Sequence, residues 1–523
     1  MALRKGRLKR FVVIAIYICV IVALVLYMRP AYPSPRARSL FGQPPATTNS
    51  HKSPAKGSGA TADDRWLCQA SDARLADIQQ RYELKKPFQY LRRAVHLTRS
   101  PDVQRQSLTK LNQRLLQKDF QLIQLDSPAQ NAVASSCAEP LEVQVSASRF
   151  PQEVDASELI FGVSTTFERF KSSGSILIQD WSFWLTDGSS RSNGGKLVLM
   201  LLKASSWQLR KARARLHEAG IDADVYASNE KLPMGARNMA LVPTMYTNPQ
   251  AKTKKWFVLC DDDTFFPNMH ALLAELAKHD ASSPLYMGAL SEDSLAVEKH
   301  GMQAFGGAGI FLSRPTAKTI TDNFAECSSE EKIDEADGQG DRLLRQCIQD
   351  HSAVHLTAIH DLWQLDLFED PSGFYEWGTR PLSLHHYRSW HHAKPSDLTA
   401  LAYIGGEDCT LQRFQTSDDF ILSGYSIAQY PHGITFDTSQ VEKTFRAEDD
   451  QGWNLDHKMG PQRGTLSQTG KKIAWKMAES SFQEDGSLLQ TYVRRANDTR
   501  WVDERGGAMS GYDGVVELVW MRG

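Results

Sequence analysis

Short apolar runs alternate with amphipathic stretches through the middle of the chain. An amphipathic stretch at 205–220 separates two of these runs. These short runs lie at residues 159–163, 196–202, 222–227 and 254–260. Apolar strands that alternate with helices are typical of a mainly parallel sheet covered by helices on both faces. The pattern therefore predicts an α/β domain over 157–395, with ligands bound beyond the C-terminal ends of its strands.

The segments on either side of this domain have different patterns. Between 63 and 156, leucines recur at three- and four-residue spacing among polar residues, which predicts a helical N-terminal extension. From 396 to 523, short alternating stretches rich in aromatic residues are separated by polar turns that contain glycine. This second pattern predicts a β-rich C-terminal extension, whose aromatic residues we expect in a core rather than on a sugar-stacking surface.

The longest apolar run lies close to the N-terminus. Residues 11–28 carry no charge and would span about 27 Å as a helix, close to the thickness of a bilayer core. Basic residues are denser in 1–10 than after the run, which favours a cytosolic tail and an uncleaved signal anchor; a cleaved signal peptide is the alternative. Residues 29–62 are rich in Pro, Ser, Gly, Ala and Thr and predict a disordered stem. We therefore expect a single-pass type II membrane protein.

Charge and cysteine content narrow the class of protein. The 60 basic and 61 acidic residues give a net charge of -1, which offers no electrostatic argument for a nucleic-acid partner. Besides Cys19 there are six cysteines, an even number that suits an oxidising lumen. A disulfide between Cys327 and Cys347 is one hypothesis. Asn497 begins the single glycosylation sequon.

Three consecutive carboxylates follow directly after the apolar run that ends at Cys260. Asp261, Asp262 and Asp263 repel one another, and a solvated acidic loop is the simplest interpretation. At the end of a buried strand, however, a divalent cation would offset that repulsion and leave open positions for diphosphate oxygens. The triplet therefore predicts a site for a metal ion and a nucleotide.

Two later motifs are candidates for the rest of such a site. Gly306, Gly307 and Ala308 precede an apolar run, which indicates either a tight turn or the floor of a pocket for a sugar or its acceptor. Asp341 stands at the predicted start of a helix, where it either caps the helix or acts as a general base.

Four histidines lie within residues 385–392, and one of them would suffice as a metal ligand. His385 follows an apolar step in the sequence. If this segment is a strand, His385 and His386 face opposite sides, so we expect only one of them in the site.

Together these motifs resemble the fringe-like branch of glycosyltransferase family 31, particularly its fungal-type members. The resemblance extends over residues 157–390 and includes the segments 360–367 and 370–373. Its five motifs, in the order of that family, are 162–166 with Arg169, 261–264, 305–313, 340–347 and 383–386.

The resemblance implies a GT-A fold and an inverting glycosyltransferase in the Golgi or endoplasmic reticulum lumen. The donor would be a UDP-sugar, the cofactor Mn²⁺, and the acceptor a glycan, glycoprotein or glycolipid hydroxyl in a β-1,3 linkage. The implied residue roles are as follows: Asp261, Asp263 and His385 (His386 if the register slips by one) bind the metal; Thr165, Thr166, Arg169, Asp261 and Asp262 bind the donor; and Asp341 is the catalytic base.

Two other classes of protein remain as alternatives. A non-catalytic luminal carbohydrate-binding or chaperone-like protein with the same fold would predict a defective metal site, whereas Asp263, His385 and Asp341 are all present. A metal-dependent phosphate-ester hydrolase would need several separated Asp/His clusters, and the sequence shows one.

Overall fold

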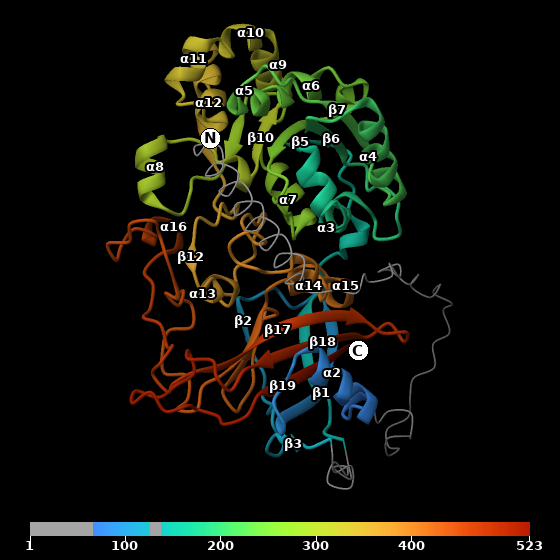
Figure 1. Ribbon diagram of the computed structural model, residues 1–523, viewed down its shortest axis with the longest axis vertical. Coiled ribbons are helices and arrows are strands. Elements are labelled where there is room, and N and C mark those ends of the chain that lie inside the picture. The colour runs from blue at the N-terminus through green and yellow to red at the C-terminus, as the bar shows by residue number, and fades with distance from the viewer. Residues whose placement is uncertain (1–65, 126–136) are drawn as a thin grey trace, which may run out of the picture. The chain divides into compact units, whose positions relative to one another are not determined.

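The computed structural model describes residues 66–125 and 137–523 (Figure 1). The predicted tail, anchor and stem over 1–62 lie outside these residues. Across the two described ranges, no helix combines the length and the apolarity needed to cross a membrane. The described chain has a mixed α/β fold built around two large sheets.

The first sheet has seven strands in the order β11-β9-β10-β8-β5-β6-β7. Its members are β5 (Leu159–Thr166), β6 (Lys196–Leu202), β7 (Ala223–Ala227), β8 (Trp256–Cys260), β9 (Tyr286–Gly288), β10 (Ile310–Ser313) and β11 (Leu356–Ala358). β10 runs antiparallel to both of its neighbours, and the remaining pairs are parallel. The predicted apolar runs therefore form a mainly parallel sheet.

Helices cover both faces of this sheet because its buried strands are apolar on both sides (Figure 1). Phe161 and Leu199 pack with α3 (Phe167–Leu185), α4 (Ser206–Glu218) and α7 (Met269–Leu276). Ile160 and Val198 point the other way. They pack with α5 (Met234–Met239), α6 (Leu241–Tyr246), α9 (Arg314–Asp322) and α12 (Gly340–His351).

The second sheet has ten strands and joins the two ends of the described chain. Its N-terminal members are β1 (Phe88–Ser100), β2 (Leu108–Lys110), β3 (Gln121–Ile123) and β4 (Leu141–Ser146). Its C-terminal members are β13 (Arg413–Gln415), β14 (Phe420–Leu422), β15 (Ser426–Gln429), β17 (Ile473–Phe482), β18 (Leu488–Arg494) and β19 (Gly514–Arg522). In Figure 1 the blue β1 lies beside the red β19, and the two strands pair in parallel from Gln89↔Gly514 to Leu97↔Arg522.

The predicted helical extension over 63–156 is wrong. In its described part, α2 (Asp72–Arg81) is the one α-helix, and most of the ordered structure is β. The leucine spacing suits a helix locally, but β1 pairs with β3, with β4 and with β19, the last more than 400 residues away, and tertiary pairing overrides local preference. The two predicted extensions are therefore not separate parts, since both contribute strands to one sheet.

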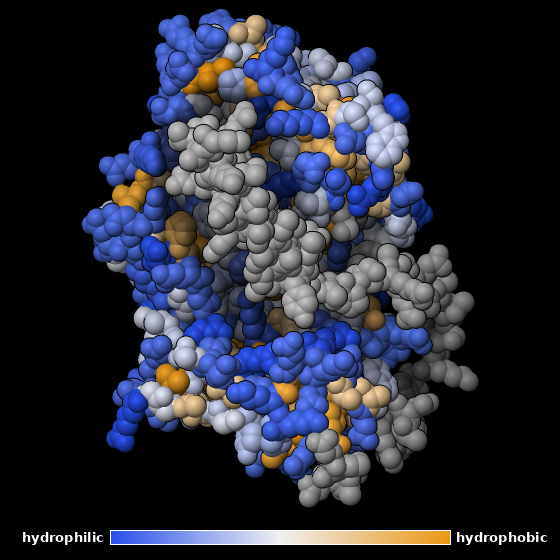
Figure 2. Space-filling model, viewed as in Figure 1, coloured by the Kyte–Doolittle hydropathy of each residue, from blue (hydrophilic) through white to orange (hydrophobic). Residues whose placement is uncertain are grey.

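Shorter elements connect and flank the two sheets. They are α8 (Ser294–His300), α10 (Phe324–Cys327), α11 (Glu330–Glu335), α13 (Ser372–Tyr375), α14 (Pro395–Thr399), α15 (Ala402–Gly405), α16 (Asp456–Met459) and the pair β12 (Phe368–Glu369) with β16 (Phe445–Arg446). The visible surface in Figure 2 is mostly hydrophilic, with hydrophobic residues in small separate groups.

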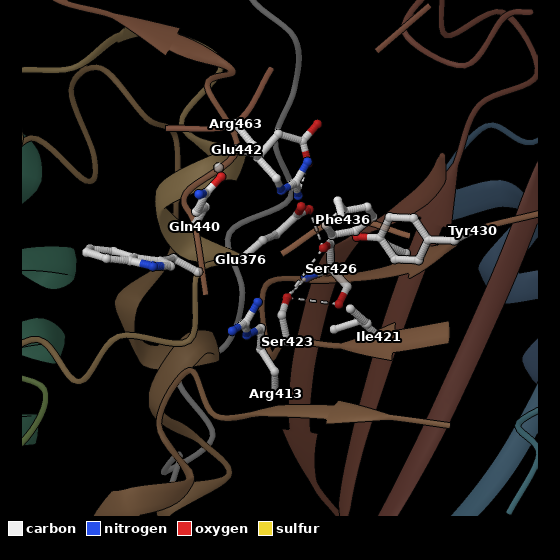
Figure 3. Close-up of a pocket in the computed structure, with 13 residues that line it drawn as sticks. Glu376, Arg413, Ile421, Ser423, Ser426, Tyr430, Phe436, Gln440, Glu442 and Arg463 are labelled. Atoms are coloured by element: carbon white, nitrogen blue, oxygen red, sulfur yellow. Dashed lines mark hydrogen bonds and ion pairs between the residues drawn. The ribbon is translucent and has the colours of Figure 1, made fainter. Parts of the chain in front are cut away.

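A small cavity lies between the segment 373–377 and the C-terminal region, among buried charged side chains (Figure 3). Its volume of about 10 Å³ is close to the space of one water molecule. Glu442, at its wall, pairs with Arg463 at 2.8 Å and with Lys472 at 2.8 Å. The cavity therefore belongs to an internal ion-pair network.

Leu518→Ala tests the core of the ten-stranded sheet. Leu518 is completely buried in β19 between strands from the two ends of the chain. Its truncation leaves a cavity, so we expect the free energy of unfolding in urea to fall by about 2–5 kcal/mol. The matched control is Leu122→Ala on β3, where the side chain is 44% exposed and we expect a change of about 0.5 kcal/mol or less. Equal losses at the two positions would contradict this core assignment.

Candidate metal centre at the end of strand β8

The acidic triplet follows strand β8 and lies beside the last residues of the parallel strand β5, which extends three residues further. β8 ends at Cys260, which pairs in register with Val163 of β5. A short antiparallel bridge then joins Phe265 to Leu384, with N–H···O distances of 2.9 and 2.8 Å. This bridge brings the histidines that follow Leu384 to the triplet, although they are more than 120 residues away in the sequence.

Asp262 is paired with donors from the neighbouring strand and helix. Its Oδ2 accepts hydrogen bonds from Thr165 Oγ1 at 2.5 Å and Arg169 Nε at 2.6 Å, and its Oδ1 accepts one from Arg169 Nη2 at 2.6 Å. Thr166 has a different role, because its hydroxyl accepts a hydrogen bond from the Arg169 N–H and caps α3. The structure therefore brings Thr165, Arg169 and Asp262 together and uses Thr166 to start the helix.

Asp263 and Asp261 face the imidazole of His385. His385 Nε2 lies 3.2 Å from Asp263 Oδ1 and 3.4 Å from Asp261 Oδ2. Burial lowers the pKa of His385, but the two carboxylates outweigh it and raise this pKa to about 10. Burial raises the pKa of Asp263, but its hydrogen bond and charge interaction with His385 reverse the shift and lower it to about 2. These opposite shifts show that the carboxylates of this site strongly favour a cation beside them.

His386 also reaches the site, which corrects the expectation that only one of the two histidines faces it. Its φ of 50° is left-handed, so the alternation of a strand does not apply at this residue. The rings of His385 and His386 lie 3.7 Å apart between centroids. Asp263, His385 and His386 each offer a ligand atom within 4.8 Å of the others.

The segment 364–366 holds both imidazoles. The Gln364 carbonyl oxygen lies 3.1 Å from His385 Nδ1, so a proton on Nδ1 leaves Nε2 free to face the carboxylates. Asp366 Oδ1 lies 3.3 Å from His386 Nε2. Such second-layer contacts orient metal-binding histidines in proteins. Both residues lie in the segment 360–367 of the family resemblance, but the sequence assigns no role to either of them.

The glycine motif packs directly behind this cluster. Gly306, Gly307 and Ala308 are buried in a 3-10 turn. A Cβ on Gly307 would lie 2.2 Å from His385 Nδ1 and 2.6 Å from Gln364 Oε1, so only glycine leaves room for the ring. The motif thus makes space for His385; its predicted role as a sugar or acceptor pocket stays a prediction.

Asp341 lies in the first turn of α12 rather than at its cap, which is Gln339. The predicted N-cap alternative is therefore wrong. Its carboxylate accepts a hydrogen bond from the Gly306 N–H at 2.8 Å. Loss of solvent raises the pKa of Asp341 to about 7, and the charge of Asp261 adds to the rise. A carboxyl that titrates near neutral pH suits proton transfer.

The remaining predicted residues lie away from the cluster. Cys327 at the end of α10 is bonded to Cys347 of α12, and a second disulfide joins Cys68 to Cys137. Asn497 is exposed in a turn after β18. The Cys327–Cys347 disulfide therefore ties α10 to α12, the helix that carries Asp341.

The donor set fits a divalent cation. It combines a carboxylate oxygen of Asp263 with imidazole nitrogens, and Asp261 lies beside them with half of its side chain exposed. Mixed oxygen and nitrogen ligands suit first-row divalent metals. Among the residues described, this is the one group of three closely spaced His, Cys, Asp or Glu ligands.

Residues 223–389 match the family model described as Fringe-like. This match contains the acidic triplet, the glycine motif, Asp341 and both histidines, and it confirms the predicted resemblance to fringe-like proteins. The chain therefore contains a fringe-like domain. No curated protein sequence matches the chain.

Several solved glycosyltransferase structures are similar to part of the chain. GlyE of Streptococcus pneumoniae TIGR4 is 11% identical, with a TM-score of 0.27 over 39% of this chain and 45% of its own. The galactosyltransferase LgtC, in complex with donor and acceptor sugar analogs, is 11% identical, with a TM-score of 0.29 over 41% of this chain and 77% of its own. The mannosyltransferase PcManGT of Pyrobaculum calidifontis, in complex with GDP-Man and Mn²⁺, is 10% identical, with a TM-score of 0.26 over 40% of this chain and 57% of its own. This chain thus spans less than half of GlyE, and similarity at this level assigns no function.

Gly307→Ala tests the packing behind His385. The added methyl group would overlap the imidazole, so we expect the ring to move and Mn²⁺ affinity, measured by calorimetry, to fall about 10-fold or more. Gly464→Ala is the matched control, because nothing lies within 4 Å of a Cβ there. Unchanged Mn²⁺ affinity in a folded Gly307→Ala variant would contradict the arrangement.

Proposed function

We propose that this chain is a metal-dependent, inverting glycosyltransferase. It moves a sugar from a UDP-sugar to a hydroxyl of a glycan, glycoprotein or glycolipid and forms a β-1,3 linkage. The observation that carries the proposal is the convergence of Asp261, Asp263, His385 and Asp341 within one fringe-like domain. Residues 11–28 would anchor it in the Golgi or endoplasmic reticulum membrane, with the rest of the chain in the lumen.

The acidic and imidazole side chains would bind a divalent cation, for which we propose Mn²⁺. Asp263 and His385 would coordinate the cation directly, and Asp261 offers a half-exposed carboxylate beside them. His386 also has a ligand atom within 4.8 Å of those of Asp263 and His385. When bound, the cation neutralises the charge that develops on the departing diphosphate. Arg169 and Asp262 stand next to this position and would hold the nucleotide end of the donor.

Asp341 would remove the proton of the acceptor hydroxyl. In a single displacement that hydroxyl attacks the face opposite the leaving diphosphate, so a base is needed on the acceptor side. The hydrogen bond from Gly306 fixes the Asp341 carboxylate, and its raised pKa makes it a stronger base than an ordinary aspartate. Binding both substrates in this geometry lowers the entropic part of the barrier.

Transfer assays with the full-length chain in detergent test the function. With Mn²⁺ and a panel of UDP-sugars, we expect transfer to a glycan acceptor that EDTA abolishes. Asp263→Ala should reduce the rate at least about 100-fold, since it removes a metal ligand. Asp102→Ala, at an exposed aspartate after β1, is the control and should leave the rate unchanged. Donor binding without transfer would indicate the non-catalytic alternative, and phosphate release without a nucleotide sugar would indicate a hydrolase.

The pH dependence tests the role of Asp341. Its folded-state pKa is raised, so below that pKa the carboxyl is protonated and cannot act as a base. We expect kcat/KM to rise about tenfold per pH unit and to level off near pH 7. At saturating Mn²⁺ we expect it to level off at a lower pH, because a cation beside Asp261 offsets the negative charge that helps to raise the pKa of Asp341.

Asp341→Asn provides the matched variant for this profile. Asparagine keeps the size and the hydrogen-bond acceptor but takes no proton, so we expect about a 10²- to 10⁴-fold loss of kcat with Mn²⁺ affinity retained. An Asp341→Asn variant that retains the parent rate and its acid limb would assign the base to another residue.

A further inference from the structure

A buried carboxylate holds the segment that orients both histidines of the metal centre. Glu292 lies between β9 and α8 with no exposed surface. Its Oε1 accepts a hydrogen bond from the Gln364 N–H at 3.0 Å, and its Oε2 accepts one from the Asp366 N–H at 3.3 Å. The residue between these two amides, Leu365, has a left-handed φ of 60°, which a side chain disfavours. Glu292 therefore stabilises an unusual backbone conformation at Leu365, between the two residues that contact His385 and His386.

The negative charge of Glu292 is balanced from the C-terminal region. Lys458, on α16, is 8% exposed, and its Nζ donates to Glu292 Oε1 at 2.9 Å. The same ammonium group donates to the carbonyl oxygens of Leu362 at 2.7 Å and Leu290 at 3.3 Å. All three N–H donors of the lysine thus face the two segments that carry Glu292 and Gln364.

Residues in and next to α16 also hydrogen-bond to the segment 291–293, which contains Glu292. His457 Nε2 lies 3.2 Å from the Ser291 carbonyl oxygen, and Asn454 Nδ2 donates to Asp293 Oδ1 at 2.8 Å. Ser291 Oγ in turn donates to Asp366 Oδ2 at 2.6 Å. The C-terminal region therefore reaches the metal centre through a continuous set of hydrogen bonds.

We propose that Lys458 is a positioning residue for the metal centre, acting through Glu292 and the backbone at 364–366 on His385 and His386. This proposal rests on the proposed function, and it assigns to the C-terminal region a part in the site rather than in stability alone. Without the ammonium group, Glu292 would be a buried charge without a countercharge and would no longer hold the two amides in place. The histidines would then lose their fixed orientation.

Lys458→Met is the direct test, with Mn²⁺ binding to the full-length chain measured from the free-ion signal in electron paramagnetic resonance. We expect Mn²⁺ affinity to fall about 10- to 100-fold. Lys472→Met is the matched control: Lys472 is 1% exposed, and it pairs with Glu376 at 2.6 Å and Glu442 at 2.8 Å in the network beside the cavity of Figure 3. The Lys472→Met variant also leaves buried carboxylates without this cation. Because the partners of Lys472 contact neither His385 nor His386, we expect the Mn²⁺ affinity of this variant to stay within about twofold of the parent.

A double variant covers the case in which Lys458→Met alone does not fold. Glu292→Gln combined with Lys458→Met removes the unbalanced charge, but glutamine has only one acceptor oxygen for two amides. We expect this variant to fold and still to bind Mn²⁺ at least about 10-fold more weakly than the parent. Parent-like Mn²⁺ affinity in the folded variants, or an equal loss in Lys472→Met, overturns the positioning role and leaves the proposed function intact. A parent that binds no Mn²⁺ overturns both.

Discussion

The site depends on the repulsion between carboxylates that follow one another at the end of a buried strand. Asp262 and Asp263 are nearly buried, so water cannot screen them as it would in an exposed loop. Arg169 neutralises Asp262 with two hydrogen bonds, and His385 lies between Asp261 and Asp263. The high pKa of His385 measures how strongly the remaining negative charge attracts a positive one. A divalent cation would meet the same demand and leave coordination positions for a ligand.

Two features of the surroundings keep this arrangement rigid. The bridge between Phe265 and Leu384 fixes the histidines relative to the triplet, and Gly307 leaves the space that the His385 ring occupies. The C-terminal region contributes Lys458, which compensates the buried charge of Glu292. The ten-stranded sheet therefore does more than flank the fringe-like domain, because one of its connecting segments supports the site.

Much of the α/β domain could be predicted from sequence because its signals are local. Short, mainly apolar runs become β5, β6, β7 and β8, and the triplet follows β8 directly. The N-terminal region could not be predicted in the same way, since the leucine spacing of a helix also suits β1, whose longest pairing is with β19 at the far end of the chain. The site residues also differ in whether a local sequence signal or a contact between distant segments identifies them. Asp263, His385 and Asp341 stand in motifs to which the sequence assigns a role. Asp366 lies in the resembling segment 360–367 without an assigned role, and Lys458 lies outside the resemblance, because both act through contacts between distant segments. The position of His386 depends on one left-handed backbone angle.

If the cluster at the end of β8 binds a nucleotide through a divalent cation, UDP needs that cation to bind tightly. Calorimetric titration of UDP into the parent protein, once with Mn²⁺ and once with EDTA, measures this dependence. We expect UDP to bind at least about 100-fold more tightly with Mn²⁺, because its diphosphate would otherwise meet carboxylates whose charge Arg169 and His385 offset only in part. Equal UDP affinity in the two titrations would mean that no cation joins the nucleotide to this cluster.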